Sequence, residues 1–262
     1  MTFPAVFITE IAKLRRSRVP WMTFIAYTFM VVIAAFFLYM MKNPGMARQL
    51  GLLGQKASFA FGGQSLDWPS FLTFVVEIGG MGALIVCSII VTFVFGREYV
   101  EGTAKNLLAL PVARGSFVIA KVVVSAVWIA ALTAWMVTVA WAAGMVVGLP
   151  GLTPGLLVAA AAKLFALAAM SLSCALLVAW VAVETHGYFA ALGFSICTLV
   201  LASVFGHTGW GRWVPWSIVG LYSGAAGPVT GVGAGSAAVL AATFLIGTLL
   251  TVRHEVCADN LQ

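Results

Sequence analysis

The sequence has few charged residues. Asp, Glu, Lys and Arg make up 8% of its 262 residues, and hydrophobic residues make up 62%. Soluble domains carry about 25% charged residues, and the mean hydropathy of +1.07 is also strongly apolar. Most of this chain must therefore face lipid or pack inside a membrane bundle. The composition predicts an all-α integral membrane protein.

The sequence also lacks the motifs of common catalytic and metal sites. It has no GxxxxGK[ST] phosphate loop, no HExxH and no GxSxG. Three histidines are scattered along the chain, and the four cysteines include no CxxC pair, so no metal-ligand spacing occurs. We therefore predict that the chain is not an enzyme and binds no metal or cofactor of its own.

What the sequence does contain is a series of long apolar runs. Crossing a bilayer takes about 20 residues, and six runs meet that length: Trp21–Met41, Phe71–Phe95, Phe117–Val147, Leu156–Val183, Tyr188–Val204 and Ser236–Val252. No internal repeat or soluble domain separates them. The chain is therefore expected to form one transmembrane domain over residues 1–262 with six spans.

The basic residues between these runs predict the orientation. With the N-terminus in the cytoplasm, nine lysines and arginines lie on the cytoplasmic side and four on the outer side. Cytoplasmic segments carry the excess of basic residues in membrane proteins, so both termini are expected in the cytoplasm. Because these residues form no single basic face, the net charge of +6 predicts no nucleic-acid partner.

Residues 205–235, before the sixth run, form an unusual outer segment. The stretch HTGWGRWVPWSIVGLYSGAAGPVTG is too apolar for a free loop, yet glycines and prolines interrupt it. Its tryptophans suit a membrane interface, and irregular backbone at membrane depth must be covered by protein or line a watery cavity. We expect a re-entrant or interfacial segment here.

The segment 97–116 concentrates charge between two apolar runs, with six charged residues between Arg97 and Lys121. Gly102 breaks the chain, Thr103 suits the N-cap of a short helix, and Pro111 ends that helix. Such a helix is too short to be stable alone in water. It would present Leu107, Leu108 and Leu110, with Glu98, Glu101, Lys105 and Arg114 as a polar rim. Either it docks in a groove, or the segment is a charged hairpin that only sets topology.

This segment resembles the cytoplasmic loop of the ABC-2 type permeases, the membrane subunits of bacterial ATP-binding-cassette exporters. Small permeases of the bacitracin and lantibiotic-immunity exporters are the nearest likeness. The family pattern is matched by Glu98, Gly102, Thr103, Leu107, Leu108, Pro111, Arg114 and Lys121.

The resemblance implies several properties. The loop would form a coupling helix that docks on a separate ATPase subunit, which would bind ATP and Mg²⁺. The permease would work as a homodimer or with a second permease chain, in the bacterial inner membrane. The cargo would be an amphipathic or hydrophobic compound, such as a peptide antibiotic, drug or lipid.

Residues 1–19 have the pattern of an interfacial amphipathic helix. On a helical wheel one side carries Phe3, Phe7, Ile8, Ile11 and Leu14, and the opposite side carries Thr9, Glu10, Lys13 and Arg16. The resemblance implies a connecting helix on the inner leaflet that touches the ATPase. The alternative is a helix that only anchors the first span.

Two charges lie inside predicted spans. Glu77 and Lys163 lie six and seven residues from the outer ends of their runs, so they share a depth of roughly 9–11 Å at 1.5 Å per residue. Each is costly alone in lipid, which suggests that they pair or face one polar cavity. Alternatively, Lys163 extends outward to the interface and Glu77 is protonated.

Three functions remain open at this point. The chain is an exporter permease, or a non-transporting membrane component that an ATPase drives for sensing, immunity or envelope assembly. The third is an ATP-independent carrier, for which Glu77 is the one carboxylate well inside a predicted span.

Overall fold

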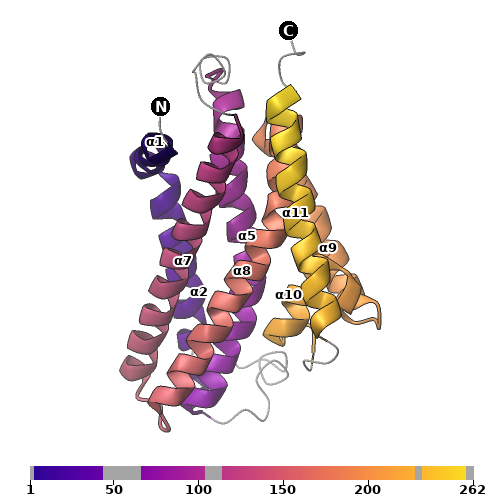
Figure 1. Cartoon of the computed structure of the whole chain (residues 1–262). Helices are drawn as coiled ribbons and strands as arrows, with labels where there is room; N and C mark the ends of the chain where they lie inside the picture. The colour runs from indigo at the N-terminus through magenta and orange to yellow at the C-terminus, as the bar shows by residue number, and fades with distance from the viewer. Residues whose placement is uncertain (1–2, 44–65, 104–113, 228–231, 258–262) are drawn as a thin grey trace.

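The computed structural model describes residues 3–43, 66–103, 114–227 and 232–257. These residues form helices and short turns, and no strand occurs among them, as the composition predicts. The elements are α1 (Phe3–Arg16), α2 (Val19–Lys42), α5 (Trp68–Val100), α7 (Arg114–Val147), α8 (Pro154–Glu184), α9 (Tyr188–Gly206), the 3-10 helix η1 (Gly211–Trp213), α10 (Pro215–Ser223) and α11 (Ala234–Cys257) (Figure 1).

Six of these helices are long and apolar enough to cross a membrane, which confirms the six predicted spans. They are α2, α5, α7, α8, α9 and α11. Several extend beyond the apolar runs, because backbone hydrogen bonding continues into the polar turns at their ends. The clearest case is α5, which continues past Phe95 to Val100.

The end of α5 corrects the predicted start of the charged loop. Residues 97–100 belong to α5, because no residue before Gly102 breaks that helix. Residues 114–116 belong to α7. Gly102 has a φ of 68°, a left-handed conformation that suits glycine. The N–H groups of Gly102 and Thr103 donate to the carbonyls of Tyr99 and Glu98, which closes the helix. Thr103 therefore completes α5, and the helix it was predicted to cap lies outside the described residues.

Side-chain caps explain where α5 and α8 begin. The Asp67 carboxylate accepts from the N–H of Ser70 at 3.0 Å, and the Thr153 hydroxyl accepts from the N–H of Leu156 at 3.4 Å. Both helices also have a proline in their first turn, where its missing N–H costs nothing.

The centre of the bundle is α5. It packs against α2, α7, α8, α9 and α10, and small residues allow the close approach. A Cβ added at Gly79 would lie 2.8 Å from the Leu164 side chain, and one at Gly80 would lie 2.5 Å from Ser223 Cβ. Because α5 contacts so many helices, a movement of α5 must be accommodated by most of the bundle.

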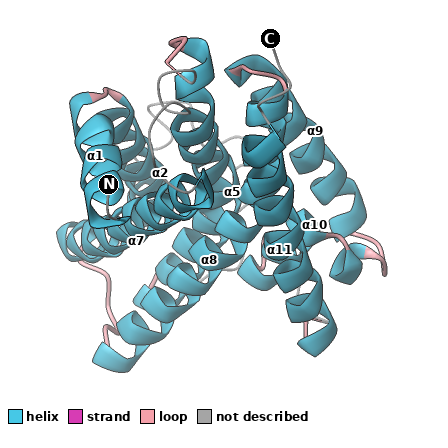
Figure 2. Cartoon of the chain, turned by 45° about the horizontal axis from the view of Figure 1, so that its top comes forward, coloured by secondary structure: helices cyan, strands magenta, loops and turns pink. Residues whose placement is uncertain are grey.

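The end of the bundle where α5 ends and α7 begins is called the loop end. Helix α1 and the C-terminal part of α11 lie at this same end (Figure 1). Figure 1 looks almost along the axis of α1, which therefore lies across the spans, and Figure 2 shows it beside α2 and α7. That α1 lies at a membrane interface stays a prediction.

The segment 205–235 contains η1 and α10 at the opposite end of the bundle, the far end (Figure 1). Helix α10 packs against α5, α8, α9 and α11, and its Ile218 and Val219 are fully buried. The Ser217 hydroxyl donates to the carbonyl of Ala202 at 3.0 Å. Helix α10 is thus covered by protein, whereas most residues from His207 to Trp213 are exposed. The place of the segment relative to the lipid stays a prediction.

Candidate functional site: a charged network where the loop begins

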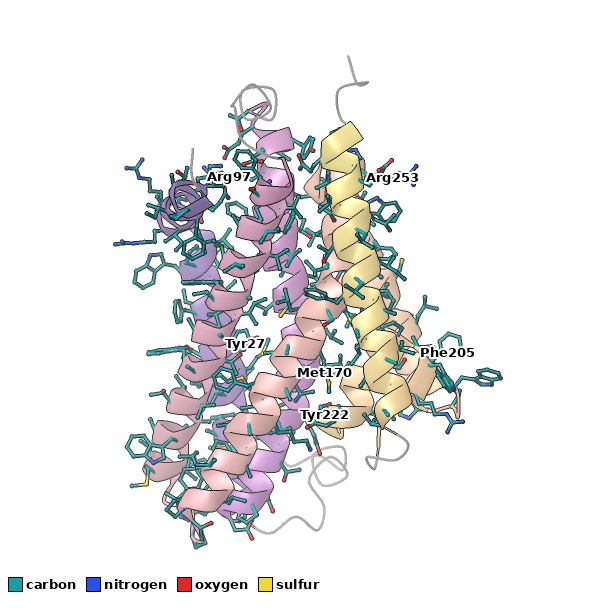
Figure 3. The ribbon with its side chains drawn as sticks, viewed as in Figure 1. Tyr27, Arg97, Met170, Phe205, Tyr222 and Arg253 are labelled. Carbon is teal, nitrogen blue, oxygen red and sulfur yellow. The ribbon has the colours of Figure 1, made fainter. Side chains whose placement is uncertain are left out.

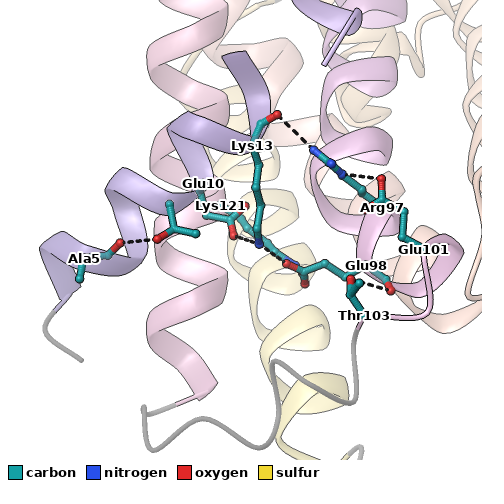
Figure 4. Close-up of polar contacts among 9 residues, drawn as sticks. Ala5, Glu10, Lys13, Arg97, Glu98, Glu101, Thr103 and Lys121 are labelled. Atoms are coloured by element: carbon teal, nitrogen blue, oxygen red, sulfur yellow. Dashed lines mark hydrogen bonds and ion pairs between the residues drawn. The ribbon is translucent and has the colours of Figure 1, made fainter. Parts of the chain in front are cut away.

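Four charged side chains meet at the loop end. Glu98, on the last turn of α5, accepts from Lys121 of α7 at 2.6 Å and from Lys13 of α1 at 2.8 Å (Figure 4). Lys13 also donates to Glu10, one turn earlier on α1, at 2.6 Å. This group, the Glu98 network, contains two carboxylates and two ammonium groups, so its charges balance.

Most of the Glu98 network is removed from water. The side chain of Lys121 is 1% exposed, and those of Glu98 and Glu10 are each 6% exposed. Low solvent access strengthens the attraction between opposite charges and makes an unpaired charge costly. Lys121 Nζ also lies 5.4 Å from the centre of the Phe95 ring, a favourable cation–π distance. Each charge in the network therefore depends on its partners.

Lys13 lies on α1, outside the membrane-spanning helices. Burial alone would lower the pKa of its ammonium, but the charge of Glu98 and the hydrogen bonds that Lys13 donates to Glu10 and Glu98 outweigh burial and raise it. A raised pKa in the folded state means that Lys13 is charged at neutral pH. The stability that it contributes is present there and is lost only as the pH rises through the raised value, in the alkaline range.

Arg97 makes a second contact between α1 and α5. Its Nη1 donates to the carbonyl of Lys13 at 3.1 Å, and its Nε donates to Glu101 at 2.8 Å. The Glu101 side chain is 48% exposed, so this second ion pair is largely solvated. Together these contacts join α1 to both helices that flank the loop.

Tyr99 points toward the other half of the bundle, although it is the next residue after Glu98. Its hydroxyl donates to Glu255 of α11 at 3.1 Å, and its ring centre lies 4.8 Å from that of His186, in the turn between α8 and α9. His254 of α11 lies 3.8 Å from Glu184 at the end of α8. The last turn of α5 thus contacts α1 and α7 through one residue, and α11 and the α8–α9 turn through the next.

Comparison with known proteins assigns the family. The sequence pattern of the ABC-2 family transporter proteins matches residues 6–203. The chain belongs to this family. One curated relative is the bacitracin transport permease protein BCRB of Bacillus licheniformis, 28% identical over 133 residues, which are 50% of this chain and 63% of that protein. The alignment therefore spans somewhat less than two thirds of the relative.

Family membership and the six apolar helices make this chain a multi-pass membrane component of the ABC-2 transporter family. No group of side chains able to hold a metal ion occurs in the described part of this ABC-2 permease.

The structure describes five of the ten predicted loop residues of the permease. Glu101, Gly102 and Thr103 are exposed. Glu98 is instead buried in the network, so the prediction that it lies on an exposed rim is wrong, because α5 continues through it and carries it between α1 and α7. Arg114 is the first residue of α7. The others lie outside the described residues: Lys105, Leu107, Leu108, Leu110 and Pro111.

The side of α1 that faces the bundle overlaps only in part with the apolar side of the helical wheel. Val6, Glu10 and Leu14, spaced four residues apart, are its buried positions. Glu10 thus lies inward, where the helical wheel placed it on the polar side, because it pairs with Lys13 beside Glu98. Phe7 and Ile11 are partly buried against the core, as expected of the apolar side. Arg16 is exposed, and Ile8 is 65% exposed.

Glu77 and Lys163 both face the end of α10. Lys163 Nζ lies 5.8 Å from the centre of the Tyr222 ring, which Figure 3 shows toward the far end. A Cβ added at Gly224, just after α10, would lie 3.5 Å from Glu77 Oε1. The two side chains carry opposite charges, but no ion pair joins them in the described structure. Their shared role in a transport pathway stays a prediction.

We expect Glu77→Gln and Lys163→Met each to lower transport severalfold, because each leaves the other charge in a span without its counter-charge. The double variant should recover part of the loss. Transport rate in reconstituted vesicles is the measurement, with Thr138→Val, an exposed polar position in α7, as the control. Wild-type rates from both single variants would remove the pair from the pathway.

Proposed function

We propose that this chain is the membrane subunit of an ABC exporter. Two copies, or one copy and a second permease chain, form the pathway through the bacterial inner membrane, with both termini in the cytoplasm. ATP and Mg²⁺ are bound by separate ATPase subunits that dock on the loop between α5 and α7. The cargo is an amphipathic or hydrophobic compound, and the bacitracin permease among its relatives supports a peptide antibiotic.

The observation that carries this proposal is the position of the Glu98 network. Glu98 lies four residues before Gly102, where α5 ends, and it holds α1 and α7 at the same point. A force applied to the loop therefore acts on three helices together, with little intervening chain to absorb it. Tyr99 carries the same movement to α11 and to the turn between α8 and α9.

The mechanism that we infer follows from these links. ATP binding brings two ATPase subunits together and displaces the docked loops, so that the end of α5 moves with α1 and α7. Because α5 packs against α2, α7, α8, α9 and α10, the helices reorient as a group. The pathway then opens alternately to the two sides of the membrane. The ATPase supplies the energy, and this chain uses the motion of the ATPase to open the pathway to one side of the membrane and then to the other.

Transport in inverted membrane vesicles tests this function. Vesicles that contain the chain and its ATPase should accumulate fluorescent bacitracin or another labelled amphipathic compound when ATP is added. Accumulation should stop with a non-hydrolysable ATP analogue and should persist with a protonophore. A wild-type vesicle that accumulates none of the compounds tested, while they stimulate ATP hydrolysis, would favour the sensing or immunity component. Accumulation without ATP, driven by an ion gradient, would favour a carrier.

A further inference from the structure

We propose that three arginines at the bend between α1 and α2 form a binding site for the phosphate of anionic phospholipids. Arg15, Arg16 and Arg18 lie within four consecutive residues and are all exposed. Within the described structure none of the three side chains donates to a carboxylate or to any other acceptor. Figure 3 shows nitrogen-tipped side chains extending from the region of α1 away from the bundle. Three guanidinium groups are therefore free to bind an external anion.

No acidic side chain on α1 competes for these arginines. The one carboxylate of α1 is that of Glu10, which is buried and paired with Lys13. Lys13 in turn is held by Glu98. The internal charges of α1 are thus satisfied inside the protein, and the charge left on its outer surface is entirely positive.

The surroundings of the arginines identify the ligand as an amphiphile. Exposed apolar side chains lie before and after them on the chain: Ile8 is 65% exposed, Trp21 73%, Met22 67% and Ile25 65%. Trp21, Met22 and Ile25 belong to α2, the first span, so this apolar surface continues into the membrane. A ligand that satisfies both surfaces has an anionic head beside an acyl chain, as a phospholipid does. An acidic protein would leave the apolar surface of α2 uncovered.

Lipid binding at this site requires neither cargo nor ATPase, so the result of the test does not depend on whether the chain exports a compound. The chain is purified alone in a neutral detergent and titrated with dioleoyl phosphatidylglycerol or dioleoyl phosphatidylcholine. Native mass spectrometry then measures the bound lipid. A basic residue near a membrane surface is worth about 1 kcal/mol of attraction to anionic lipid, so we expect about tenfold or greater preference for phosphatidylglycerol.

Two variants and one control show whether the lipid preference depends on the charge of these arginines. Arg15→Gln/Arg16→Gln/Arg18→Gln should lose the preference, and the corresponding triple lysine variant should keep most of it, because the charge is retained. Arg212→Gln/Arg253→Gln removes exposed arginines elsewhere and should behave as wild type. Inorganic phosphate should not displace the lipid, because it has no acyl chain for the apolar surface.

Several results would overturn the site. These are equal binding of the two lipids by the wild type, a preference that persists in the glutamine variant, or a lysine variant that binds as weakly as the glutamine variant. Displacement by inorganic phosphate would show a general anion site instead. If the glutamine variant kept its lipid preference but lost the ATPase on co-purification, the arginines would belong to a protein interface.

Discussion

Glu98→Gln should lower the midpoint of thermal unfolding by about 10 °C, because breaking a buried ion pair costs about 3–5 kcal/mol. The amide removes the negative charge that holds both Lys13 and Lys121, and its nitrogen cannot accept a hydrogen bond from a lysine. Lys121, at 1% exposure, cannot reach water without moving α7. The network would change from a balanced set of charges to a net charge of about +1 in a site with little water.

Two further variants separate the charge effect from general damage. Glu101→Gln removes a carboxylate that is 48% exposed and paired with Arg97, so it should shift the midpoint by no more than about 2 °C. Glu98→Gln/Lys121→Met removes the charges of Glu98 and Lys121 together and leaves Lys13 paired with Glu10, so much of the lost stability should return. Intrinsic tryptophan fluorescence in detergent reports the midpoint. A wild-type midpoint for Glu98→Gln would refute the role of the network.

The six spans were predictable from the sequence because the membrane imposes a simple rule. A helix that crosses lipid needs about 20 apolar residues, and runs such as Phe71–Phe95 stand out in composition alone. The ends of the helices were less predictable. Composition does not show whether charged residues after an apolar run continue the helix. In α5 they continue it as far as Val100, and Gly102 then adopts a left-handed conformation.

The Glu98 network was only partly predictable, because its contacts join distant parts of the chain. Lys13 is 85 positions from Glu98, and Lys121 is 23 positions away. One signal was nevertheless present: Lys121 lies four residues inside the third apolar run, and a charge inside a span indicates a partner. The same rule drew attention to Glu77 and Lys163. Applied to Lys121, it would have indicated a buried acceptor on a neighbouring helix.

The inward position of Glu10 and the contacts of Tyr99 left no such signal. A helical wheel sorts residues by polarity, and it placed Glu10 on the polar side because the wheel does not contain the lysine of another helix. Tyr99 meets His186 and Glu255 only because α8, α9 and α11 fold back to the loop end. These contacts depend on tertiary packing, which local sequence patterns do not encode.

Leu107→Asp/Leu108→Asp should abolish binding of the ATPase, the largest functional effect that we expect. A docking helix gains its affinity from apolar side chains placed in a groove, and a buried aspartate without a partner costs several kcal/mol, roughly enough to lower affinity more than a hundredfold. Because both positions lie after the end of α5, the Glu98 network and the spans should remain folded. Leu152→Asp, at the far end and 37% exposed, is the control for an added charge on an exposed leucine.

The most direct test of an ATPase-driven permease is co-purification of a nucleotide-binding protein with the tagged full-length chain in detergent. The account predicts that an ATPase accompanies the wild type and the Leu152→Asp variant and is missing from Leu107→Asp/Leu108→Asp, while all three chains elute as folded protein. An ATPase that stays bound to the double variant would contradict docking through this loop. If no ATPase accompanies even the wild type, the loop only sets topology and an ATP-independent carrier becomes the better explanation.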